Sequence, residues 1–331
     1  MFSKKISVVL ACYNEERYII NAIKTVQDMD YPQDLTEILI VDGGSTDNTL
    51  KIVSEYAEKY KNIKLYHNPR KISPVAFNIG IVNATGDYII LMSAHSKYKP
   101  NYFKILTEKI IELAADLVGG YSITKTITDT KVSNAIVKVI MNKFGLGGAK
   151  MRTGISKIEQ VDTVTGMFRK SVFDKVGLFN ERLVRNQDIE LSKRITASGG
   201  KIFIIPDVNF IYYARDNYKD LWINNYRNGM WVPLTVYITK KLGALSLRHF
   251  IPLVFLLSVI IPVIAMVISP LFGIIGLVSF ILHFLLVLVT SKKINDNSTS
   301  VFHLIIAFYT IHLSYGFGSL HGLLKINELF K

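Results

Sequence analysis

Two polar segments near the start of the chain each follow an apolar run, and their residue types suit nucleotide binding. Residues 37–41 (EILIV) lead into Asp42 and the sequence DGGSTDNT. A carboxylate at the end of a buried strand is well placed to accept a hydrogen bond from a base or a ribose. The two glycines allow a tight turn, and Ser45 or Thr46 can cap the next helix. A capping turn without a ligand explains DGGS equally well, so the hypothesis depends on its combination with the preceding YNEE at residues 13–16.

A third polar segment of this kind carries no carboxylate. The apolar residues 88–92 (YIILM) end at Ser93, Ala94 and His95. A serine hydroxyl and an imidazole hold Mg²⁺ poorly because this ion prefers hard oxygen ligands, whereas Mn²⁺ tolerates imidazole better. Asp87 cannot replace the missing carboxylate, since a strand rises about 3.3 Å per residue and Asp87 stands at its other end. His95 can equally be a hydrogen-bonded residue at a strand end with no ligand role.

The elements that must position these segments alternate between strands and helices. Apolar runs predict strands at residues 6–12, 37–41, 63–67 and 87–92, and apolar periodicity predicts helices near 19–26, 50–60 and 74–83. Alternation at this spacing is typical of a doubly wound α/β sheet. Ligands bind at the carboxyl ends of the strands in such sheets. Residues 124–160 mix Gly, Lys and Thr, and we expect them to include a mobile loop.

The last quarter of the chain is strongly apolar. Residues 250–269, 271–290 and 301–320 are each long enough to cross a bilayer core of ~30 Å. Three buried helices of a soluble fold are the alternative, but soluble helices rarely lack a polar face three times in succession. Residues 217–250 place tryptophans and tyrosines among cations, which is the composition of an interfacial amphipathic segment.

Net charge and cysteine content narrow the function classes. The formal net charge is +13, and Cys12 is the single cysteine. A disulfide framework is therefore excluded. No basic stripe interleaved with aromatic residues and no nucleic-acid motif occurs, so the positive charge favours anionic lipid headgroups or a phosphate-bearing substrate over nucleic acid.

The chain resembles family-2 glycosyltransferases of the inverting GT-A type over most of residues 3–231. The segments that carry the resemblance are SVVLACYNEE, ILIVDGGSTDNT, AFNIGIVNATGDYIILMSAHS, VDTVTGMFRKSVFDKVGLFNERLVRNQDIELSKRI and, weakly, RNGMW. NKFGLGGAKMR and VDTVTGMFRK resemble the branch typified by succinoglycan-type exopolysaccharide transferases. The resemblance implies a GT-A domain with a mixed sheet in residues 1–215, followed by interfacial helices in 216–249 and about three transmembrane helices in 250–331.

The resemblance also implies roles for individual residues. The nucleotide-sugar would bind at the three polar segments, through Ala11, Tyr13, Asn14, Glu15, Asp42, Gly43, Ser93, Ala94 and His95. Inversion at an anomeric carbon needs one general base on the face opposite the departing diphosphate, and the position of NQDIE makes Asp188 that base. Glu190 and Gln187 would orient neighbours or the acceptor, together with Arg227 and Trp231. Without the family, two exposed carboxylates in the first turn of a helix are the simpler interpretation.

Two departures from the family pattern bear on the cofactor and the product. The family has Asp-x-Asp where this chain has Ser93-Ala94-His95, so the divalent cation, Mn²⁺ rather than Mg²⁺, would be held by His95 and the diphosphate. Otherwise Lys97, Lys150 or Arg152 neutralises the diphosphate, or the enzyme is impaired. The processive (Gln/Arg)-x-x-Arg-Trp signature appears with Met230 in place of its second arginine, which favours addition of a single sugar.

The glycine-rich NKFGLGGAKMR, which includes Lys150 and Arg152, suits a loop that closes over a diphosphate, since backbone N–H groups and cations bind phosphate. A flexible surface loop is the alternative. A domain that uses nucleotide-sugars should face the cytoplasm, and Lys292-Lys293 between the second and third apolar segments fit that orientation. If the third segment crosses the membrane, Lys325 lies on the outer side, against the preference of cations for the cytoplasmic side. A re-entrant third segment would keep Lys325 on the cytoplasmic side.

The sequence therefore predicts a multi-pass protein of the cytoplasmic (inner) membrane. It would transfer one sugar, from a UDP-sugar in preference, to a lipid-linked acceptor of the polyprenyl-phosphate type in exopolysaccharide or capsule assembly. Two alternatives stay open. A regulatory membrane protein would keep the nucleotide pocket after Ser93 had removed catalysis, and a processive polysaccharide synthase would make a long product.

Overall fold

The computed structural model describes residues 3–94, 96–146 and 150–326 of the chain. The chain folds into two units, each of which is built from two separate stretches. Unit 1 comprises residues 1–123 and 154–212, and unit 2 comprises residues 124–153 and 213–331.

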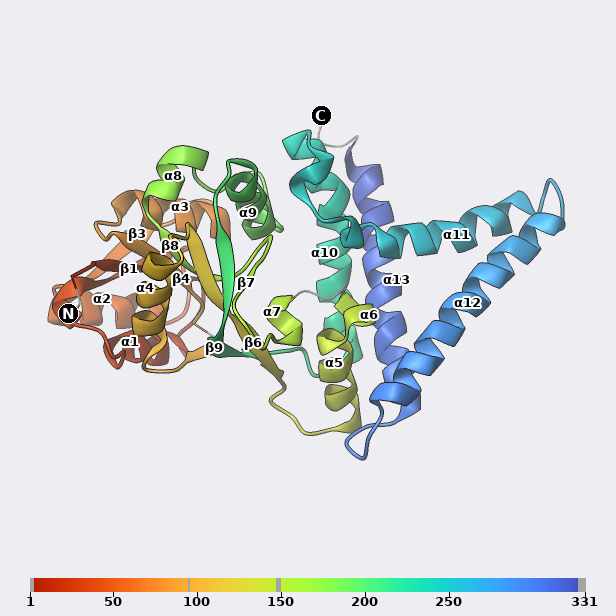
Figure 1. Cartoon of the computed structure of the whole chain (residues 1–331), viewed down its shortest axis with the longest axis horizontal. Coiled ribbons are helices and arrows are strands. Elements are labelled where there is room, and N and C mark those ends of the chain that lie inside the picture. The colour runs from red at the N-terminus through yellow and green to blue at the C-terminus, as the bar shows by residue number, and fades with distance from the viewer. Residues whose placement is uncertain (1–2, 95, 147–149, 327–331) are drawn as a thin grey trace. The chain divides into compact units, whose positions relative to one another are not determined.

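Unit 1 contains one mixed sheet with helices packed around it (Figure 1). Its strands, in the described residues, have the order β3-β2-β1-β4-β8-β6-β9-β5, and β7 pairs with β9. The bounds of the strands are β1 Ile6–Cys12, β2 Thr36–Asp42, β3 Ile63–His67, β4 Tyr88–Met92, β5 Lys97–Tyr98, β6 Leu117–Lys125, β7 Glu159–Gln160, β8 Gly166–Arg169 and β9 Ile202–Tyr213. The helices are α1 Ile19–Gln27, α2 Thr49–Lys59, α3 Ser73–Asn83, α4 Tyr102–Glu112, α8 Ser171–Val176 and α9 Gln187–Ala197, with a short 3₁₀ turn η1 Gln33–Leu35.

The parallel half of the sheet follows the sequence closely, and the predicted strands and helices of residues 6–92 are confirmed within one or two residues. β1 and β2 are apolar and buried along nearly their whole length because helices cover both faces of a parallel sheet. The register pairs Cys12 with Asp42 and Asp42 with His67. β1, β2 and β3 therefore end together, and the segments that follow them share one edge of the sheet.

β8 reverses the direction of the sheet. It pairs antiparallel with β4 on one side and with β6 on the other. The core beneath the sheet joins both halves, since Ile90 of β4, Met167 of β8 and Val208 of β9 belong to one buried cluster with Phe103 of α4. The mixed sheet of the predicted GT-A fold is thus confirmed.

Unit 2 is helical. Its elements are α5 Lys131–Met141, α6 Lys143–Leu146, α7 Lys150–Thr153, α10 Tyr218–Thr239, the 3₁₀ turns η2 Leu242–Ala244 and η3 Leu247–His249, α11 Ile251–Ala265, α12 Leu271–Ile294 and α13 Val301–Lys325. Residues 131–141, within the stretch 124–160 that was expected to include a mobile loop, form a helix. Thr130 and Ser133 form a capping box, and Ala135, Ile136, Val139 and Ile140 are buried at helical spacing.

Three helical stretches of unit 2 are long and apolar enough to cross a membrane: Leu247–Ala265, Leu271–Ile294 and Val301–Lys325. They correspond to the three apolar segments of the sequence. The first two stretches present leucine, isoleucine, valine and phenylalanine to their surroundings on nearly all sides.

Candidate active site

Asp42 ends β2 as a buried carboxylate, only 2% exposed. Its Oδ2 accepts hydrogen bonds from the backbone N–H of Gly44 at 2.8 Å and of Ser45 at 3.0 Å, and its Oδ1 accepts from the Ser45 hydroxyl. Gly44 adopts a φ of 77°, which favours glycine. The carboxylate thus shapes the turn at the carboxyl edge of the sheet and holds its negative charge in a fixed place there.

The segment after β1 is joined to the turn after β2 by reciprocal hydrogen bonds. The Asn14 N–H donates to the Ser45 hydroxyl at 2.9 Å, and the Asn14 side-chain oxygen accepts from the Thr46 N–H at 2.8 Å. One residue further, the Glu15 N–H donates to the Thr49 hydroxyl at 2.7 Å. Asn14 has a left-handed φ of 56°, which asparagine tolerates better than most residues. The expectation that Ser45 or Thr46 caps α2 is wrong, because their polar groups are used in this junction and Asn48 is the N-cap residue.

Cys12 lies beneath the same junction and is inert. It is buried and its sulfur is 3.7 Å from Asp42 Oδ1. Burial, followed by the nearby charge of Asp42, raises the pKa of the thiol. The thiol therefore stays protonated, and a nucleophilic role for Cys12 is not supported.

Lys71 is a residue of this edge that the sequence interpretation missed. Its ammonium lies 5.6 Å from the centre of the Tyr13 ring, and its side chain is the nearest neighbour of Gly44, with Cε 3.5 Å from the position of an added Cβ. Tyr13 itself is 47% exposed. Lys71 lies in the segment after β3, whereas Asp42 is the last residue of β2, and Lys71 has a left-handed φ of 57°. The signal that could have revealed it was its place just beyond the third parallel strand.

The segment after β4 is only partly described. Ser93 is exposed and Ala94 half-buried, and the Ser96 N–H donates to the Ser93 carbonyl. His95, the predicted metal ligand, lies outside the described residues. Among the residues that are described, no group of three or more His, Cys, Asp or Glu side chains could hold a metal ion. Ala11, at the end of β1, and Gly43, whose N–H donates to the Cys12 carbonyl at 2.9 Å, complete the predicted nucleotide-binding set.

The predicted acceptor residues of unit 1 lie in the first turn of α9. Asn186 precedes the helix with a left-handed φ of 63°, Gln187 is half-buried and Asp188 is exposed. Glu190 is buried, and both of its oxygens accept hydrogen bonds from Arg194, at 2.8 and 2.9 Å. Glu190 therefore orients Arg194, and Asp188 is the carboxylate of the pair that faces solvent.

Long-range hydrogen bonds tie the segment before α9 to α3 and to the loop before it, which carries Lys71. The Asn78 side chain in α3 donates to the Phe179 carbonyl and accepts from the Phe179 N–H, both at 2.9 Å. Asn78 also donates to Glu181, which forms an ion pair of 2.8 Å with Arg70. Arg70 adjoins Lys71 in the chain, so the approach to Asp188 is fastened to the edge that holds Asp42 and Tyr13.

The remaining predicted site residues belong to unit 2. Lys150 and Arg152 lie in the short helix α7, and Arg227 and Trp231 lie one turn apart in α10. Their places relative to the residues of unit 1 are therefore not part of the described geometry.

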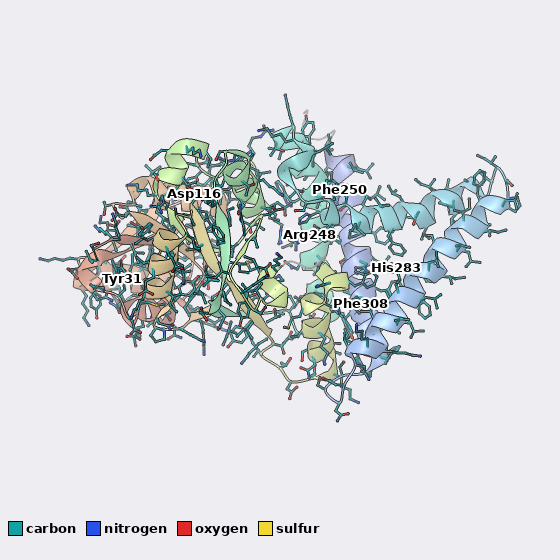
Figure 2. All side chains as sticks on the ribbon, in the orientation of Figure 1. Tyr31, Asp116, Arg248, Phe250, His283 and Phe308 are labelled. Atoms are coloured by element: carbon teal, nitrogen blue, oxygen red, sulfur yellow. The ribbon has the colours of Figure 1, made fainter. Side chains whose placement is uncertain are left out.

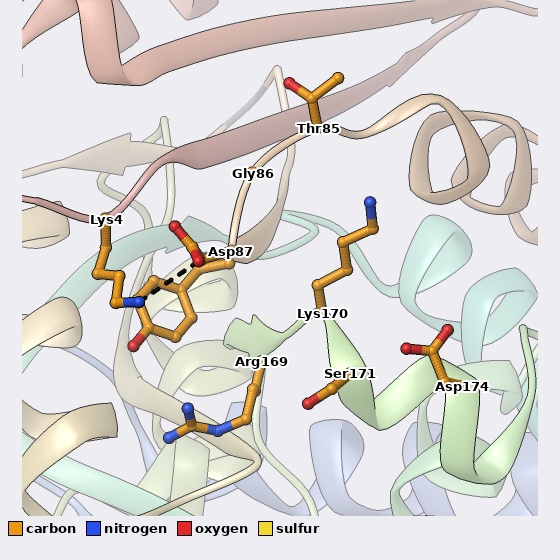
Figure 3. A pocket seen from close by; sticks show the side chains of 9 residues that line it. Lys4, Thr85, Gly86, Asp87, Arg169, Lys170, Ser171 and Asp174 are labelled. Atoms are coloured by element: carbon orange, nitrogen blue, oxygen red, sulfur yellow. Dashed lines mark hydrogen bonds and ion pairs between the residues drawn. The ribbon is translucent and has the colours of Figure 1, made fainter.

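Figure 3 shows a hollow of unit 1 whose lining residues Lys4 and Asp87 precede β1 and β4, at the edge opposite to Asp42. Its volume is about 380 Å³, and its lining includes Lys4, Asp87, Arg169, Lys170 and Asp174. Asp87 accepts a hydrogen bond from the Lys5 N–H at 2.9 Å and lies 3.5 Å from the Lys4 ammonium. This placement confirms that Asp87 cannot serve the edge where Ser93 lies. Ligands of such sheets bind at the carboxyl ends of the strands, so this hollow is not the candidate active site.

A mixed sheet with polar segments gathered at the carboxyl ends of its parallel strands is a GT-A-like fold. Residues 7–177 match the family described as glycosyl transferase family 2. The chain therefore belongs to glycosyltransferase family 2.

Relatives and solved structures agree with this assignment. The chain is 28% identical over 333 residues to a dolichyl N-acetyl-α-D-glucosaminyl phosphate glucuronosyltransferase of the diacetamido type from Methanococcus voltae, which covers 98% of this chain and 99% of the relative. It is 29% identical over 210 residues to the succinoglycan biosynthesis protein ExoA of Rhizobium meliloti, covering 63% of each. The solved structure of a mannosyltransferase from Pyrobaculum calidifontis, with GDP-Man and Mn²⁺, matches with a TM-score of 0.59 at 16% identity and covers 94% of this chain and 87% of that one.

Proposed function

We propose that this glycosyltransferase moves a single sugar from a nucleotide-sugar, a UDP-sugar in preference, to a lipid-linked acceptor of the polyprenyl-phosphate type. The reaction inverts the anomeric centre and takes place at the cytoplasmic face of the inner membrane during exopolysaccharide or capsule assembly. The observation that carries the proposal is the carboxyl edge of the sheet, where hydrogen bonds join the Asn14 segment to the turn of Asp42 and Ser45 and where Lys71 lies beside Tyr13. The names of the two relatives, one acting on a dolichyl-linked sugar and one in succinoglycan biosynthesis, support the lipid-linked acceptor.

The donor would be recognised at this edge through its nucleotide. Asp42 is fixed by Gly44 and Ser45, so its charge needs no reorganisation when a base or ribose donates to it. Tyr13 presents an exposed aromatic ring on which a base can stack, and the Lys71 ammonium next to it suits a phosphate. These groups bind and orient the donor without taking part in bond breaking.

Asp188 is the proposed general base. Its carboxylate would take the proton from the acceptor hydroxyl as that oxygen bonds to the anomeric carbon, while the bond from this carbon to the nucleoside diphosphate breaks on the opposite face. The protonated Asp188 and the free nucleoside diphosphate are the by-products. Asp188 suits this role because it is exposed in the first turn of α9, whereas Glu190 is held by Arg194. Gln187 would orient the acceptor next to it.

A divalent cation, Mn²⁺ in preference to Mg²⁺, would neutralise the diphosphate when bound. The described residues do not provide a carboxylate pair for it, since Ser93 stands where an aspartate would be and no cluster of three ligands occurs among them. Lys71, and in unit 2 Lys150 and Arg152, are the cations that can neutralise the diphosphate in its place. We therefore derive no step through a metal ion.

Addition of one sugar rather than a polymer is supported by the residue type at Met230. Met230 stands where processive enzymes have an arginine, and its backbone is covered by α13: an added Cβ at Gly318 or Gly322 would come within 3.0 or 2.2 Å of it. Arg227 and Trp231, on the neighbouring turns of α10, remain candidates for acceptor contacts.

The test is a donor screen with the purified protein in detergent. Nucleotide-sugars would be scored for release of nucleoside diphosphate in the presence of a polyprenyl-phosphate glycan and of Mn²⁺, Mg²⁺ or a chelator. Asp188→Asn is expected to lower kcat by 10²-fold or more, as removal of a general base does on the order of 10²–10⁴-fold, while donor binding is retained. Turnover retained in Asp188→Asn would remove Asp188 from the mechanism. Donor binding without turnover in the wild-type chain, with any cation, would instead favour a regulatory protein.

A further inference from the structure

The three apolar helices of unit 2 differ in how much of their surface the chain itself covers. In the most apolar window of α13, 50% of the residues are buried, against 11% in α11 and 11% in α12. Residues 250–291 contain no Asp, Glu, Lys or Arg. At the turn between α11 and α12, Val267 is 89% exposed and Ile268 is 80% exposed. α11 and α12 therefore need a hydrocarbon environment, whereas α13 already has protein neighbours.

The main neighbour of α13 is the polar helix α10, and the two helices lie extremely close together. An added Cβ at Gly229 of α10 would come within 2.0 Å of the Tyr315 carbonyl, and one at Gly318 of α13 would come within 2.0 Å of the Tyr226 carbonyl. Such distances exclude any side chain at these positions. Glycines on both helices thus allow backbone-to-backbone packing along the pair, as Figure 1 shows for α10 and α13.

Polar groups of α13 are directed at protein partners as well. Pro233 has no N–H to donate to the Gly229 carbonyl in its own helix, and the Ser319 hydroxyl donates to this carbonyl instead at 3.1 Å. The Tyr226 hydroxyl and His321 Nδ1 are 2.6 Å apart. On another face of α13, His312 Nε2 lies 2.9 Å from the Phe144 carbonyl of α6. α13 is therefore bonded into the rest of unit 2 as a helix of a globular domain would be.

The partner helix could not accompany α13 across a bilayer without a large penalty. α10 exposes Lys219, Asp220 and Arg227. A charged side chain at the centre of a bilayer is unfavourable by about 2.5–3.5 kcal/mol on insertion scales. α5, which also packs against α13, contributes Lys138 in an ion pair with Asp296. The α10–α13 pair consequently fits the headgroup level and not the hydrocarbon core.

α11 and α12 leave this pair as a hairpin. The first turn of α11 contacts α13. An added Cβ at Gly316 of α13 would lie 2.7 Å from the Pro252 carbonyl of α11. Near the same level His283 of α12 stacks on Phe255 at 3.7 Å and lies 3.1 Å from His312 of α13; Figure 2 labels His283 and Phe308 in this helical unit. Beyond this level α11 and α12 pack on each other, with the hydroxyls of Ser258 and Ser279 2.6 Å apart.

We propose that the chain enters the bilayer through the α11–α12 hairpin alone, and that this hairpin enters and leaves by the same face. α13 stays on that face with α10, at the level of anionic lipid headgroups. Cations flank the hairpin at both ends and complement such headgroups: Lys240, Lys241 and Arg248 precede α11, and Lys292 and Lys293 lie in the last turn of α12. Val301–Lys325 is long and apolar enough for the third crossing expected at residues 301–320, but in this proposal it does not cross, and Lys325 falls on the same side as the other cations.

The test compares the side of the membrane reached by Lys325 with that reached by unit 1. In a full-length chain with Cys12→Ala, single cysteines are introduced by Lys325→Cys and, as reference, by Glu58→Cys, which is exposed in α2. Sealed membrane vesicles of each orientation are treated with a membrane-impermeant maleimide, before and after detergent. Both cysteines are expected to label in the same vesicles and to be protected in the other orientation.

Labelling of Lys325→Cys in the orientation that protects Glu58→Cys would place α13 across the bilayer and overturn the proposal. A reporter enzyme or fluorescent protein fused after residue 331, active on one side of the membrane only, gives the same answer without the cysteine substitutions. If the fusion reports the side opposite to Glu58, the proposal fails. Neither result depends on transferase activity, so a failed donor screen and a failed topology are distinguishable.

Discussion

Glu37 and Asp42 lie near opposite ends of the buried strand β2, and their surroundings differ although both carboxylates are almost inaccessible, at 3% and 2% exposure. Glu37 accepts hydrogen bonds from groups far away in the chain: the Ser7 hydroxyl at 2.6 Å, the Thr85 N–H at 2.6 Å and the Lys64 ammonium at 3.2 Å. Asp42 accepts from Gly44 and Ser45, in its own turn.

The difference shows how one sheet assigns separate roles to two similar groups. Glu37 joins three neighbouring strands at the amino edge and is enclosed by its partners. Burial alone would raise the pKa of its carboxyl, but the hydrogen bonds from Ser7, Thr85 and Lys64 lower it to about 2. Asp42 organises a turn whose neighbours, Tyr13 among them, are exposed. Low accessibility alone therefore does not distinguish the two carboxylates, whereas the sequence distance to their partners and the exposure of the surrounding edge do.

The largest effect is expected at the amino edge, from Glu37→Gln. The variant loses the ion pair with Lys64 and places an amide N–H₂ at the position of Oε2, which faces the Lys64 and Lys5 ammonium groups. We expect the free energy of unfolding of unit 1 to fall by about 1.5–3 kcal/mol, as for the loss of hydrogen bonds to a charged group, with an unchanged KM for the donor. Thermal unfolding of the two proteins in the same detergent measures this. An unchanged melting temperature together with a raised donor KM would mean that the amino edge of β2, and not the carboxyl edge, serves donor binding.

The same pair of proteins should respond differently to acid. The folded-state pKa of Glu37 is lowered from 4.5 to about 2, so its contribution to stability is complete above pH 4.5 and is lost as the pH falls towards 2. The difference in melting temperature between wild type and Glu37→Gln should therefore be constant near neutral pH and shrink between these two values. A difference that stays constant throughout would show that the lost contact is not ionic.

A smaller effect, on binding and not on stability, is expected from Asp42→Asn. Asparagine keeps an oxygen that can accept from Gly44 and Ser45, so the turn should survive. Loss of the charge should raise the donor KM about tenfold, the equivalent of one charge-assisted hydrogen bond. Steady-state kinetics and binding of the nucleoside diphosphate check this. A fall in melting temperature comparable to that of Glu37→Gln would mean that Asp42 is structural as well.

The smallest effect is expected from Lys71→Gln. Its ammonium lies beside Tyr13 at an exposed site, so its loss should raise the donor KM only a few-fold, about 1 kcal/mol or less. Lys61→Gln is the matched control, because Lys61 is exposed in the turn before β3, at the amino edge of the same strand. Equal changes in KM for both variants would indicate a general charge effect instead of a contact at the carboxyl edge.

The sequence by itself determined the parallel half of the sheet and the edge at which Asn14 and Asp42 meet. Strand and helix periodicity is local, and parallel strands of known direction must end at one edge. Local pattern also placed Asp188 at the start of a helix. It could not separate Asp188 from Glu190, because the bond of Glu190 to Arg194 depends on how α9 is oriented against the chain before it.

Tertiary structure alone decided the contacts between residues that are distant in the chain. Lys71 joins Tyr13 only because β3 ends beside β2, and Glu37 gains its partners only when three strands align. Hydropathy predicts a membrane span for each of α11, α12 and α13, because it depends on the residue types of a helix and not on what packs against it. The glycines of α10 and α13, set apart by some ninety residues, bring two backbones into contact, and that packing leaves α13 more buried than the two other apolar helices.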